Sequence, residues 1–315
     1  MKGKFWVGAA GATAAAASAA LYGAYRKAFY SDRGPWMDPF AISPNGEYQA
    51  RKEEMLSLIA ALAERPCERV SITSRDGLRL TGRYYHAADD APLDIAFHGY
   101  RGHALRDFCG GSCISFAQGH NLLLVDQRAH GGSEGRTITF GAKEKWDCLD
   151  WVLWATERFG APEISLFGVS MGAATVLLAS ALDLPDNVLC VVADCAYSRG
   201  EDIIADVGRN MGFPDGLTRL AAHGAARLFG GFRLADAAPA DALRQAKVPV
   251  LLLHGEDDRL VPCAMSAELE KACCGPVERL TFPEAGHGLS YLVDRERYTA
   301  AVIGFVERCR AAEKN

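Results

Sequence analysis

The sequence has no framework of paired cysteines, although it contains 10 cysteine residues. There is no Cys-x-x-Cys pair, and no histidine or further cysteine completes a zinc set around Cys109 and Cys113. The cysteines therefore indicate neither a disulfide scaffold nor a structural metal, and we expect no metal and no cofactor. Unpaired thiols in this number are typical of a reducing compartment or an anaerobic habitat.

The sequence also has no excess of basic residues, no long block of like charge, no low-complexity tract and no internal repeat. Its 34 lysine and arginine residues are outnumbered by 39 aspartate and glutamate residues, giving a formal net charge of −5. A nucleic acid is therefore not an expected partner. The chain has 315 residues, 49% of them hydrophobic. What remains after about the first fifty residues has the size of a single α/β domain.

An uncharged segment stands near the N-terminus. Residues 5–25 contain no charged side chain and are dominated by alanine and glycine. A helix over them would reach about 31 Å, enough to cross a bilayer core. We therefore expect a membrane-associated protein with a single N-terminal anchor, although its orientation is not predicted. A cleaved signal peptide with small residues at 17–20, or a plain alanine-rich tail, would instead make the protein secreted or cytoplasmic.

The rest of the chain divides at turn-forming dipeptides. Gly34-Pro35 and Asn45-Gly46 belong to a stretch, residues 30–50, that predicts a linker between the hydrophobic segment, residues 1–29, and a domain over 51–315. In that domain, apolar periodicity predicts a helix over 51–64, and two short runs at 69–73 and 78–85 predict an antiparallel hairpin.

From residue 93 onward, apolar runs alternate with helical stretches. Strands are expected at 93–97, 122–125, 163–167, 188–193, 248–253 and 277–282, with helices between them. This alternation predicts an α/β fold with a mostly parallel, eight-stranded sheet covered by helices on both faces. Residues 196–246 interrupt the rhythm, and we expect a small cap there, above the carboxyl edge of the sheet. The alternative is a crossover helix with surface loops.

The most informative motif is Gly168-Val169-Ser170-Met171-Gly172, between a predicted strand and an alanine-rich helix. This order is that of the nucleophile elbow of α/β-hydrolases, in which a strained turn exposes the serine hydroxyl at the carboxyl edge of the sheet. A second match, Gly131-Gly132-Ser133-Glu134-Gly135, opens no such helix. We interpret it as a glycine-rich loop.

A base and an acid follow the elbow in the order that the fold requires. His287 lies just after the last strand, between two glycines, and is the expected general base; His223 lies within the expected cap. Asp258 follows another strand and is the expected acid, which would fix the imidazole tautomer and stabilise the imidazolium. Asp257 is the alternative in an exposed loop, and Asp194, at the end of the preceding strand, is a rival position.

Two backbone N–H groups are expected to form an oxyanion hole. Met171 follows the nucleophile and provides one, and Tyr100, after the strand at 93–97, provides the other. We expect His98 to brace this loop rather than to take part in the chemistry. Tyr100, Arg101 and His103 are the residues expected to bind substrate at the mouth of the pocket.

Several of these motifs together resemble one family. They are His98-Gly99-Tyr100, residues 126–133, the elbow at 168–172, residues 254–262 and Gly286-His287. The chain resembles the serine aminopeptidase and prolyl-oligopeptidase-like branch of the α/β-hydrolase superfamily, and within it bacterial proteins with an N-terminal hydrophobic segment and no assigned substrate. The resemblance covers about residues 65–310 and implies ester, thioester or amide substrates and no metal.

We therefore expect a serine hydrolase that works through an acyl-enzyme on carboxylic esters or related small acyl substrates. A peptidase, an amidase or an acyltransferase would use the same three residues. The alternative from another class is a non-catalytic binding protein of this fold at a membrane. The sequence predicts no oligomeric state.

Overall fold

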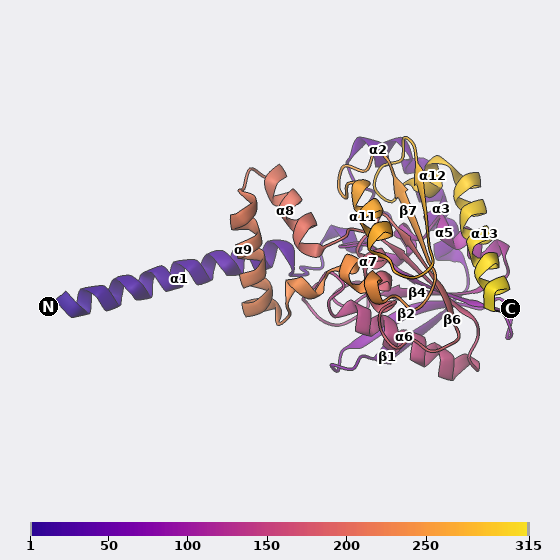
Figure 1. The fold of residues 1–315 in the computed structure, drawn as a ribbon, viewed down its shortest axis with the longest axis horizontal. Helices are drawn as coiled ribbons and strands as arrows, with labels where there is room; N and C mark the ends of the chain where they lie inside the picture. Colours follow the sequence, from indigo (N-terminus) through magenta and orange to yellow (C-terminus); the bar gives the residue numbers. More distant parts are fainter. Residues whose placement is uncertain (1, 314–315) are drawn as a thin grey trace.

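The computed structural model describes residues 2–313, which form one eight-stranded sheet between two layers of helices (Figure 1). The strand order is β1-β2-β4-β3-β5-β6-β7-β8. β1 and β2 form the expected antiparallel hairpin, β2 pairs antiparallel with β4, and all other neighbours are parallel. The strands are β1 (Glu68–Thr73), β2 (Arg79–Tyr85), β3 (Leu93–Phe97), β4 (Asn121–Asp126), β5 (Ile164–Val169), β6 (Val188–Asp194), β7 (Val250–Gly255) and β8 (Val277–Phe282).

The central strands are buried on both sides because helices cover each face of the sheet. One face carries α6 (Glu144–Phe159), α7 (Met171–Ala179), α10 (Pro239–Ala242) and α11 (Ala264–Ala272). The other carries α3 (Lys52–Glu64), α4 (Ala104–Asp107), α5 (Gly111–Ala117), α12 (Ser290–Val293) and α13 (Arg295–Glu313). Side chains of one strand alternate between the two layers. Leu123 of β4, for example, packs on the face covered by α6 and α7, and Leu122 packs on the face covered by α3 and α4.

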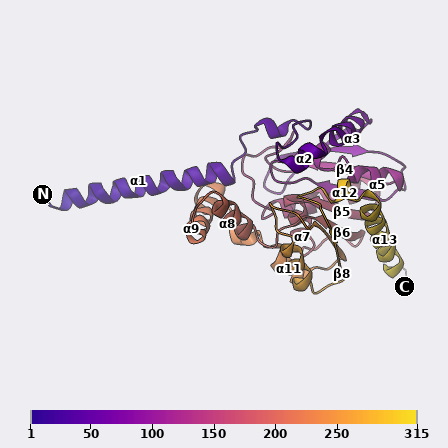
Figure 2. The ribbon, with the colours of Figure 1, turned by 90° about the horizontal axis from the view of Figure 1, so that it is seen from above.

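The N-terminal segment forms one long helix, α1 (Lys2–Ala28), which projects from the body (Figures 1 and 2). Among residues 2–313, no helix is both long and apolar enough to cross a membrane. The structure therefore does not support the transmembrane helix that we expected over residues 5–25. The physical reason is composition, because alanine and glycine dominate the segment and contribute little to the free energy of insertion.

The expected cap region forms a helical hairpin beside α1. α8 (Gly200–Asn210) and α9 (Asp215–Ala225) are followed by a π-helical turn (Ala226–Gly230) and two short 3-10 turns (Leu234–Asp236, Leu243–Gln245). Tyr22 and Tyr25 of α1 pack against Phe229, at ring-centroid distances of 5.2 and 6.0 Å. The hairpin thus holds the C-terminal half of α1 (Figure 2).

Residues 31–48 then cross from the end of α1 to α3, and we call them the strap. The strap contains a 3-10 turn (Pro35–Met37) and leads into α2 (Gly46–Ala50). It is fixed to the domain, because Ser31 Oγ donates to Ala129 O (2.6 Å) and Arg106 Nη1 donates to Ala41 O (3.0 Å). The stretch that we expected to be a linker is therefore packed against the loops at the carboxyl edge of the sheet.

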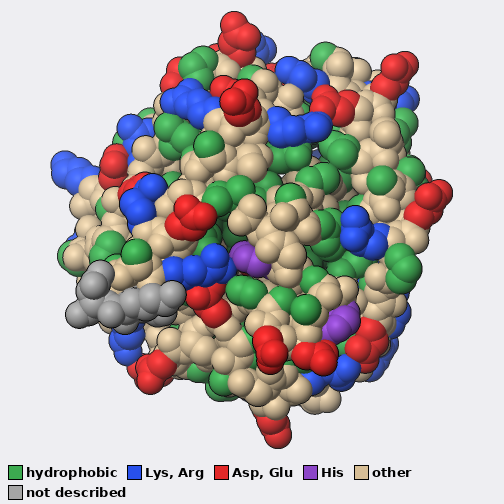
Figure 3. All heavy atoms as spheres, turned by 90° about the vertical axis from the view of Figure 1, so that its right-hand side faces the viewer, with side chains coloured by type: hydrophobic (Ala, Val, Ile, Leu, Met, Phe, Trp, Pro, Cys, Tyr) green, Lys and Arg blue, Asp and Glu red, His purple; other side chains and the backbone are tan. Residues whose placement is uncertain are grey.

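The face of the molecule that points away from α1 is shown in Figure 3. Acidic and basic side chains alternate across it, and neither sign gathers into a patch. Such mixed charge is the ordinary surface of a folded domain and gives no electrostatic footprint for a polyanion on this face.

Candidate active site

The elbow serine lies in the strained turn that its motif predicts. Ser170 has φ 56° and ψ −117°, between the end of β5 and the start of α7. A Cβ atom on Gly172 would lie 1.8 Å from the carbonyl oxygen of Phe97, and one on Gly168 would lie 2.3 Å from that of Gly172. Only glycine fits at these two positions. The backbone N–H of Ser170 donates to Asp194 O (2.8 Å), which ties the turn to the neighbouring strand.

The structure brings His287 and Asp258 to this serine. His287 Nε2 lies 2.9 Å from Ser170 Oγ, and His287 Nδ1 lies 2.7 Å from Asp258 Oδ2. Asp258 is buried, whereas Asp257 is exposed, in line with our choice between the two. The three side chains thus form one hydrogen-bonded chain from carboxylate to hydroxyl.

Several donors keep Asp258 ionised. Its Oδ1 accepts from the backbone N–H groups of Leu260 (2.9 Å) and Val261 (2.8 Å). Burial alone would raise the pKa of Asp258, but hydrogen bonds from His254 and His287 outweigh it and hold the pKa well below its usual range. His254 Nε2 lies 3.3 Å from Asp258 Oδ2 and 2.9 Å from Val261 O. We did not assign His254 a role from the sequence, although the sequence places it only four residues before Asp258.

The loop after β3 holds the amide of Tyr100, which we expected to be an oxyanion donor. The N–H of Gly99 donates to Asp107 Oδ2 (2.8 Å), and the N–H of Arg101 donates to His130 Nε2 (3.0 Å). The amide of Tyr100, between these two anchored groups, has no hydrogen-bond partner among the described residues. Met171 is the first residue of α7, so its N–H is likewise free of a helical partner.

Two buried histidines brace this loop. His98 Nε2 accepts from the N–H of Gln127 (3.1 Å), and Gln127 Nε2 donates back to His98 O (2.5 Å). Burial lowers the pKa of both His98 and His130, so both rings are neutral and serve as fixed acceptors. His98 therefore has the bracing contacts that we expected. Gln127 and His130, which our site prediction omitted, belong to the same support.

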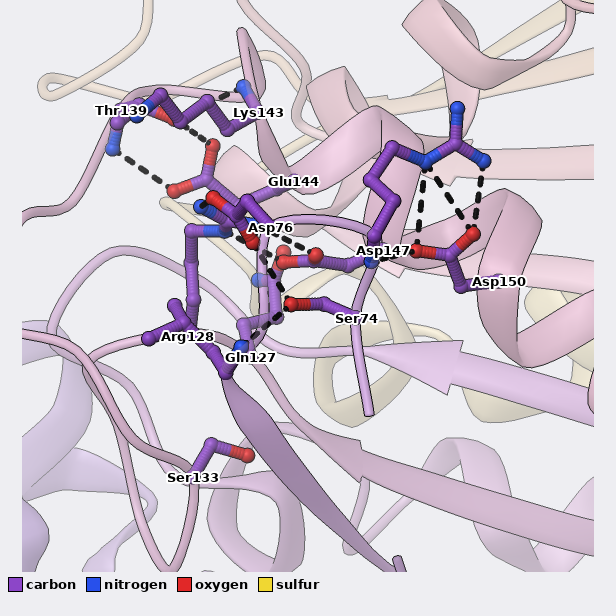
Figure 4. Close-up of polar contacts among 12 residues, drawn as sticks. Ser74, Asp76, Gln127, Arg128, Ser133, Thr139, Lys143, Glu144, Asp147 and Asp150 are labelled. Atoms are coloured by element: carbon purple, nitrogen blue, oxygen red, sulfur yellow. Dashed lines mark hydrogen bonds and ion pairs between the residues drawn. The ribbon is translucent and has the colours of Figure 1, made fainter. Parts of the chain in front are cut away.

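An ion cluster around the buried side chain of Arg128 holds the loop that follows β4 (Figure 4). Arg128 is 4% exposed and forms bidentate contacts with Asp147, at 2.6 Å to each oxygen, and contacts Asp76 at 2.9 and 3.1 Å. Ser133, from the second serine motif, is buried and donates to Asp126 O (2.5 Å). It lies in a loop, as we interpreted it, and its hydroxyl donates to a backbone carbonyl and not to an imidazole.

The residues expected at the pocket mouth divide into two groups. Tyr100 and Arg101 line the cavity in front of Ser170. Their side chains also donate to backbone carbonyls at the end of α1, Tyr100 to Ala28 (3.0 Å) and Arg101 to Lys27 and Tyr30 (3.1 Å each). His103 does not line the cavity, since its Nδ1 accepts from the N–H of Leu105 and caps α4. A histidine immediately before a helical turn is the signal that we missed.

Two further buried groups adjoin the site. Asp194, the rival acid position, contacts Ser290 Oγ (3.4 Å) instead of the imidazole, and burial raises its pKa to about 6. Cys195 Sγ lies 4.0 Å from His287 Nε2. Within residues 2–313, Cys195, Asp258 and His287 are the one set with ligand atoms close enough for a metal. Both imidazole nitrogens already contact Asp258 and Ser170, so a metal there would break the chain to the serine.

A cavity of about 560 Å³ opens at Ser170, within the range of small-molecule sites. Its roof is the strap, which contributes Trp36, Ile42 and Tyr48. Tyr48 Oη also donates to His287 O (2.6 Å), so the roof contacts the loop of the base. None of the residues that line this cavity comes from the expected cap at 196–246. His223, in that region, contacts Glu201 (2.8 Å) and lies apart from Ser170.

The sequence of this chain is similar to that of several known proteins. Residues 95–235 match the model of a family described as alpha/beta hydrolase fold. A Bacillus subtilis protein, YqkD, described as uncharacterized, is 28% identical over 191 residues, which are 60% of this chain and 63% of that protein. An uncharacterized Mycobacterium tuberculosis protein, Rv2307c, is 26% identical over 243 residues, which are 75% of this chain and 78% of that protein. The chain thus spans somewhat less than two thirds of YqkD.

Solved structures show the same fold. The Pyrococcus furiosus esterase Pf2001 superposes with a TM-score of 0.64 at 23% identity, over 79% of this chain and 93% of that one. Together with the sheet order, this similarity establishes the α/β-hydrolase fold that the sequence predicted.

Proposed function

We propose that this chain is a serine hydrolase of the α/β-hydrolase superfamily, acting on carboxylic esters through an acyl-enzyme at Ser170. The observation that carries the proposal is the chain of contacts from Asp258 through His287 to Ser170, at 2.7 and 2.9 Å. Structural neighbours that are esterases support an acyl-hydrolysing activity. For the branch within the superfamily, we propose the serine aminopeptidase and prolyl-oligopeptidase-like group, on the sequence motifs alone.

The proposed reaction begins with attack of Ser170 Oγ on the ester carbonyl. His287 Nε2 accepts the serine proton, and ionised Asp258 stabilises the imidazolium through Nδ1. The oxyanion of the tetrahedral intermediate accepts hydrogen bonds from the N–H groups of Tyr100 and Met171, each worth about 3 kcal/mol in the transition state. His287 then protonates the leaving alcohol, and water attacks the acyl-enzyme by the same route.

A fluorophosphonate probe tests this proposal directly. It should label the native protein at Ser170 and should label neither Ser170→Ala nor His287→Ala. Ser133→Ala is the matched control, because Ser133 has the same sequence motif but its hydroxyl donates to Asp126 O and not to an imidazole, and the variant should be labelled like the native protein. Labelling that persists in Ser170→Ala would refute the proposal.

The alternative functions would use the same site. They differ in the bond that is cleaved, in the group that accepts the acyl chain, or in whether there is any turnover. A peptidase or amidase would hydrolyse aminoacyl p-nitroanilides, which a simple esterase would leave intact, and an acyltransferase would give more ester than acid when an alcohol is added. A non-catalytic binding protein would keep its ligand affinity in Ser170→Ala and would show no turnover. Rates on the two substrate series, measured side by side, distinguish these cases.

For the location we propose contact with a lipid surface in place of a span. Large apolar side chains of the helical hairpin beside α1 are exposed to solvent, namely Phe213 (52%), Leu217 (58%), Leu220 (71%) and Leu228 (65%). They adjoin the uncharged segment of α1, and an apolar surface next to a helix of this kind fits the interfacial region of a bilayer. Flotation with liposomes should recover the native protein, and Leu217→Ser with Leu220→Ser should reduce the recovery. Equal recovery of both proteins would refute the contact.

A further inference from the structure

The cavity at Ser170 extends away from the mouth, between the sheet and α5. We call this extension the inner arm. It is lined by Ala96 of β3, Leu122 of β4, Phe167 of β5, and Ile114 and Ser115 of α5. All of these except Phe167 are buried, so the inner arm reaches into the core layer that lies on one face of the sheet.

The depth of the inner arm follows from strand geometry. Phe167 precedes Ser170 by three residues along β5, which corresponds to about 10 Å at 3.3 Å per residue. Leu122 precedes the carboxyl end of β4 at Asp126 by four residues, or about 13 Å. The inner arm therefore runs along the strands from the serine towards the opposite edge of the sheet.

The chemistry of the inner arm is apolar. Of the two carboxyl groups that line the whole cavity, Asp107 accepts from the N–H of Gly99 and Asp194 contacts Ser290, and burial raises the pKa of Asp194 to about 6. Tyr291 and Leu292 form part of the wall near α12. No lysine or arginine lines the inner arm, and Arg101 and Arg106 both lie at the mouth, where they bond to backbone carbonyls. A charged acyl chain would find no counter-ion inside, whereas an alkyl chain would bury apolar surface.

We propose that the inner arm is an acyl-binding tunnel and that the enzyme prefers esters of medium-chain aliphatic acids. A chain of roughly six to ten carbons spans the distance of about 10–13 Å over which the inner arm follows β5 and β4. Ala96 pairs with Leu124 and lines the side of the inner arm, whereas Leu122 lies two residues farther from the carboxyl edge and limits the chain length. This proposal rests on the hydrolase activity proposed above, and the following experiments separate the two.

The first experiment measures kcat/KM for p-nitrophenyl esters from acetate to palmitate. Each methylene group that enters an apolar tunnel should raise kcat/KM by about fourfold until the end is reached. We expect a maximum between about six and ten carbons, followed by a fall. A steady decline from acetate onward, in a protein whose Ser170 is labelled by fluorophosphonate, would overturn the tunnel and leave the hydrolase intact.

Two substitutions on one strand give a matched test. Leu122→Ala enlarges the end of the inner arm and should shift the maximum by about two carbons to longer chains. Leu123→Ala removes the same atoms from the next residue, but Leu123 faces the core on the other side of the sheet. It should lower stability similarly and leave the maximum where it is. A shift of equal size in both variants would overturn the proposal.

Variants that fill the inner arm should act in the opposite direction. Ala96→Leu should shorten the preferred chain and lower kcat/KM for the octanoate ester at least tenfold, with the acetate ester changed less than twofold. Ala96 is 1% exposed, so Ser115→Leu on α5 is the second variant if Ala96→Leu does not fold. Unchanged chain preference in a folded filling variant would contradict the assignment.

A binding measurement does not require turnover. Decanoate should raise the Tm of Ser170→Ala by an amount that grows with its concentration, and acetate at the same concentration should not raise it. When Ala96→Leu is combined with Ser170→Ala, the rise in Tm caused by decanoate should be smaller. If no ester is hydrolysed and decanoate still stabilises Ser170→Ala, the proposed reaction fails while the tunnel stands. If decanoate has no effect, the tunnel fails.

Discussion

Asp194 makes the stability of the protein depend on pH in a way that one substitution should remove. The carboxyl group is buried at the end of β6, and burial raises its pKa from 3.8 to about 6. Between these values the folded chain holds a proton that the unfolded chain has released. The free energy of unfolding should therefore fall as pH rises from about 4 to about 6. A shift of about two units corresponds to about 3 kcal/mol.

Asp194→Asn has nearly the same shape and cannot ionise. The amide oxygen can still accept from Ser290, so the fold should be retained. As pH rises from 4 to 7.5, the free energy of unfolding of the variant should increase by about 3 kcal/mol relative to that of the native protein. Other titrating groups are common to both proteins and cancel in the difference.

Urea unfolding at several pH values measures this difference, with the free energy extrapolated linearly to water. Asp257→Asn is the control, because Asp257 is a solvent-exposed carboxylate near the same site, and its curve should run parallel to that of the native protein. Parallel curves for Asp194→Asn and the native protein would show that the carboxyl group of Asp194 has the same pKa in the folded and unfolded states and would refute the reasoning.

Three other substitutions test the site and its support. Asp258→Asn should keep the fold and lower kcat by about 10⁴, because the amide would favour the wrong tautomer of His287; a loss below tenfold in ester hydrolysis would speak against the assigned acid. Arg128→Leu should cost about 3–5 kcal/mol in urea unfolding, because it leaves the buried carboxylate of Asp147 without a partner, and a cost below 1 kcal/mol would contradict the role of the ion cluster. Gly172→Ala should abolish labelling of Ser170 and destabilise the elbow, because its Cβ would meet Phe97 O at 1.8 Å; normal labelling in a folded Gly172→Ala would show that the turn is less tightly packed.

Local patterns predicted much of this fold. The strands at 93–97 and 277–282 have the bounds that the sequence indicated, because short apolar runs between turn residues leave little choice of ends. The elbow was predicted with its neighbours because Gly168 and Gly172 are required by contacts inside the turn itself. His287 between two glycines and Asp258 after a strand could likewise be identified as candidates from their local sequence.

Contacts between distant parts of the chain were not predictable in this way. No local pattern shows that Tyr48 bonds to His287 O, or that the strap covers Ser170 where a cap was expected. His254 was missed because its role depends on the path of the loop at Asp258, which brings Val261 back beneath it. The transmembrane helix that we expected over residues 5–25 was not found among the described residues.

The position of the strap has a consequence for how such an enzyme can change. The residues that roof the cavity precede α3, whereas Ser170, Asp258 and His287 follow β5 and later strands. Insertions or deletions between residues 31 and 48 that keep Tyr48 in place would therefore remodel the entrance without disturbing strand register. The shape of the entrance and the reactivity are encoded in separate stretches of sequence, which allows each to evolve, or to be exchanged by design, with little cost to the other.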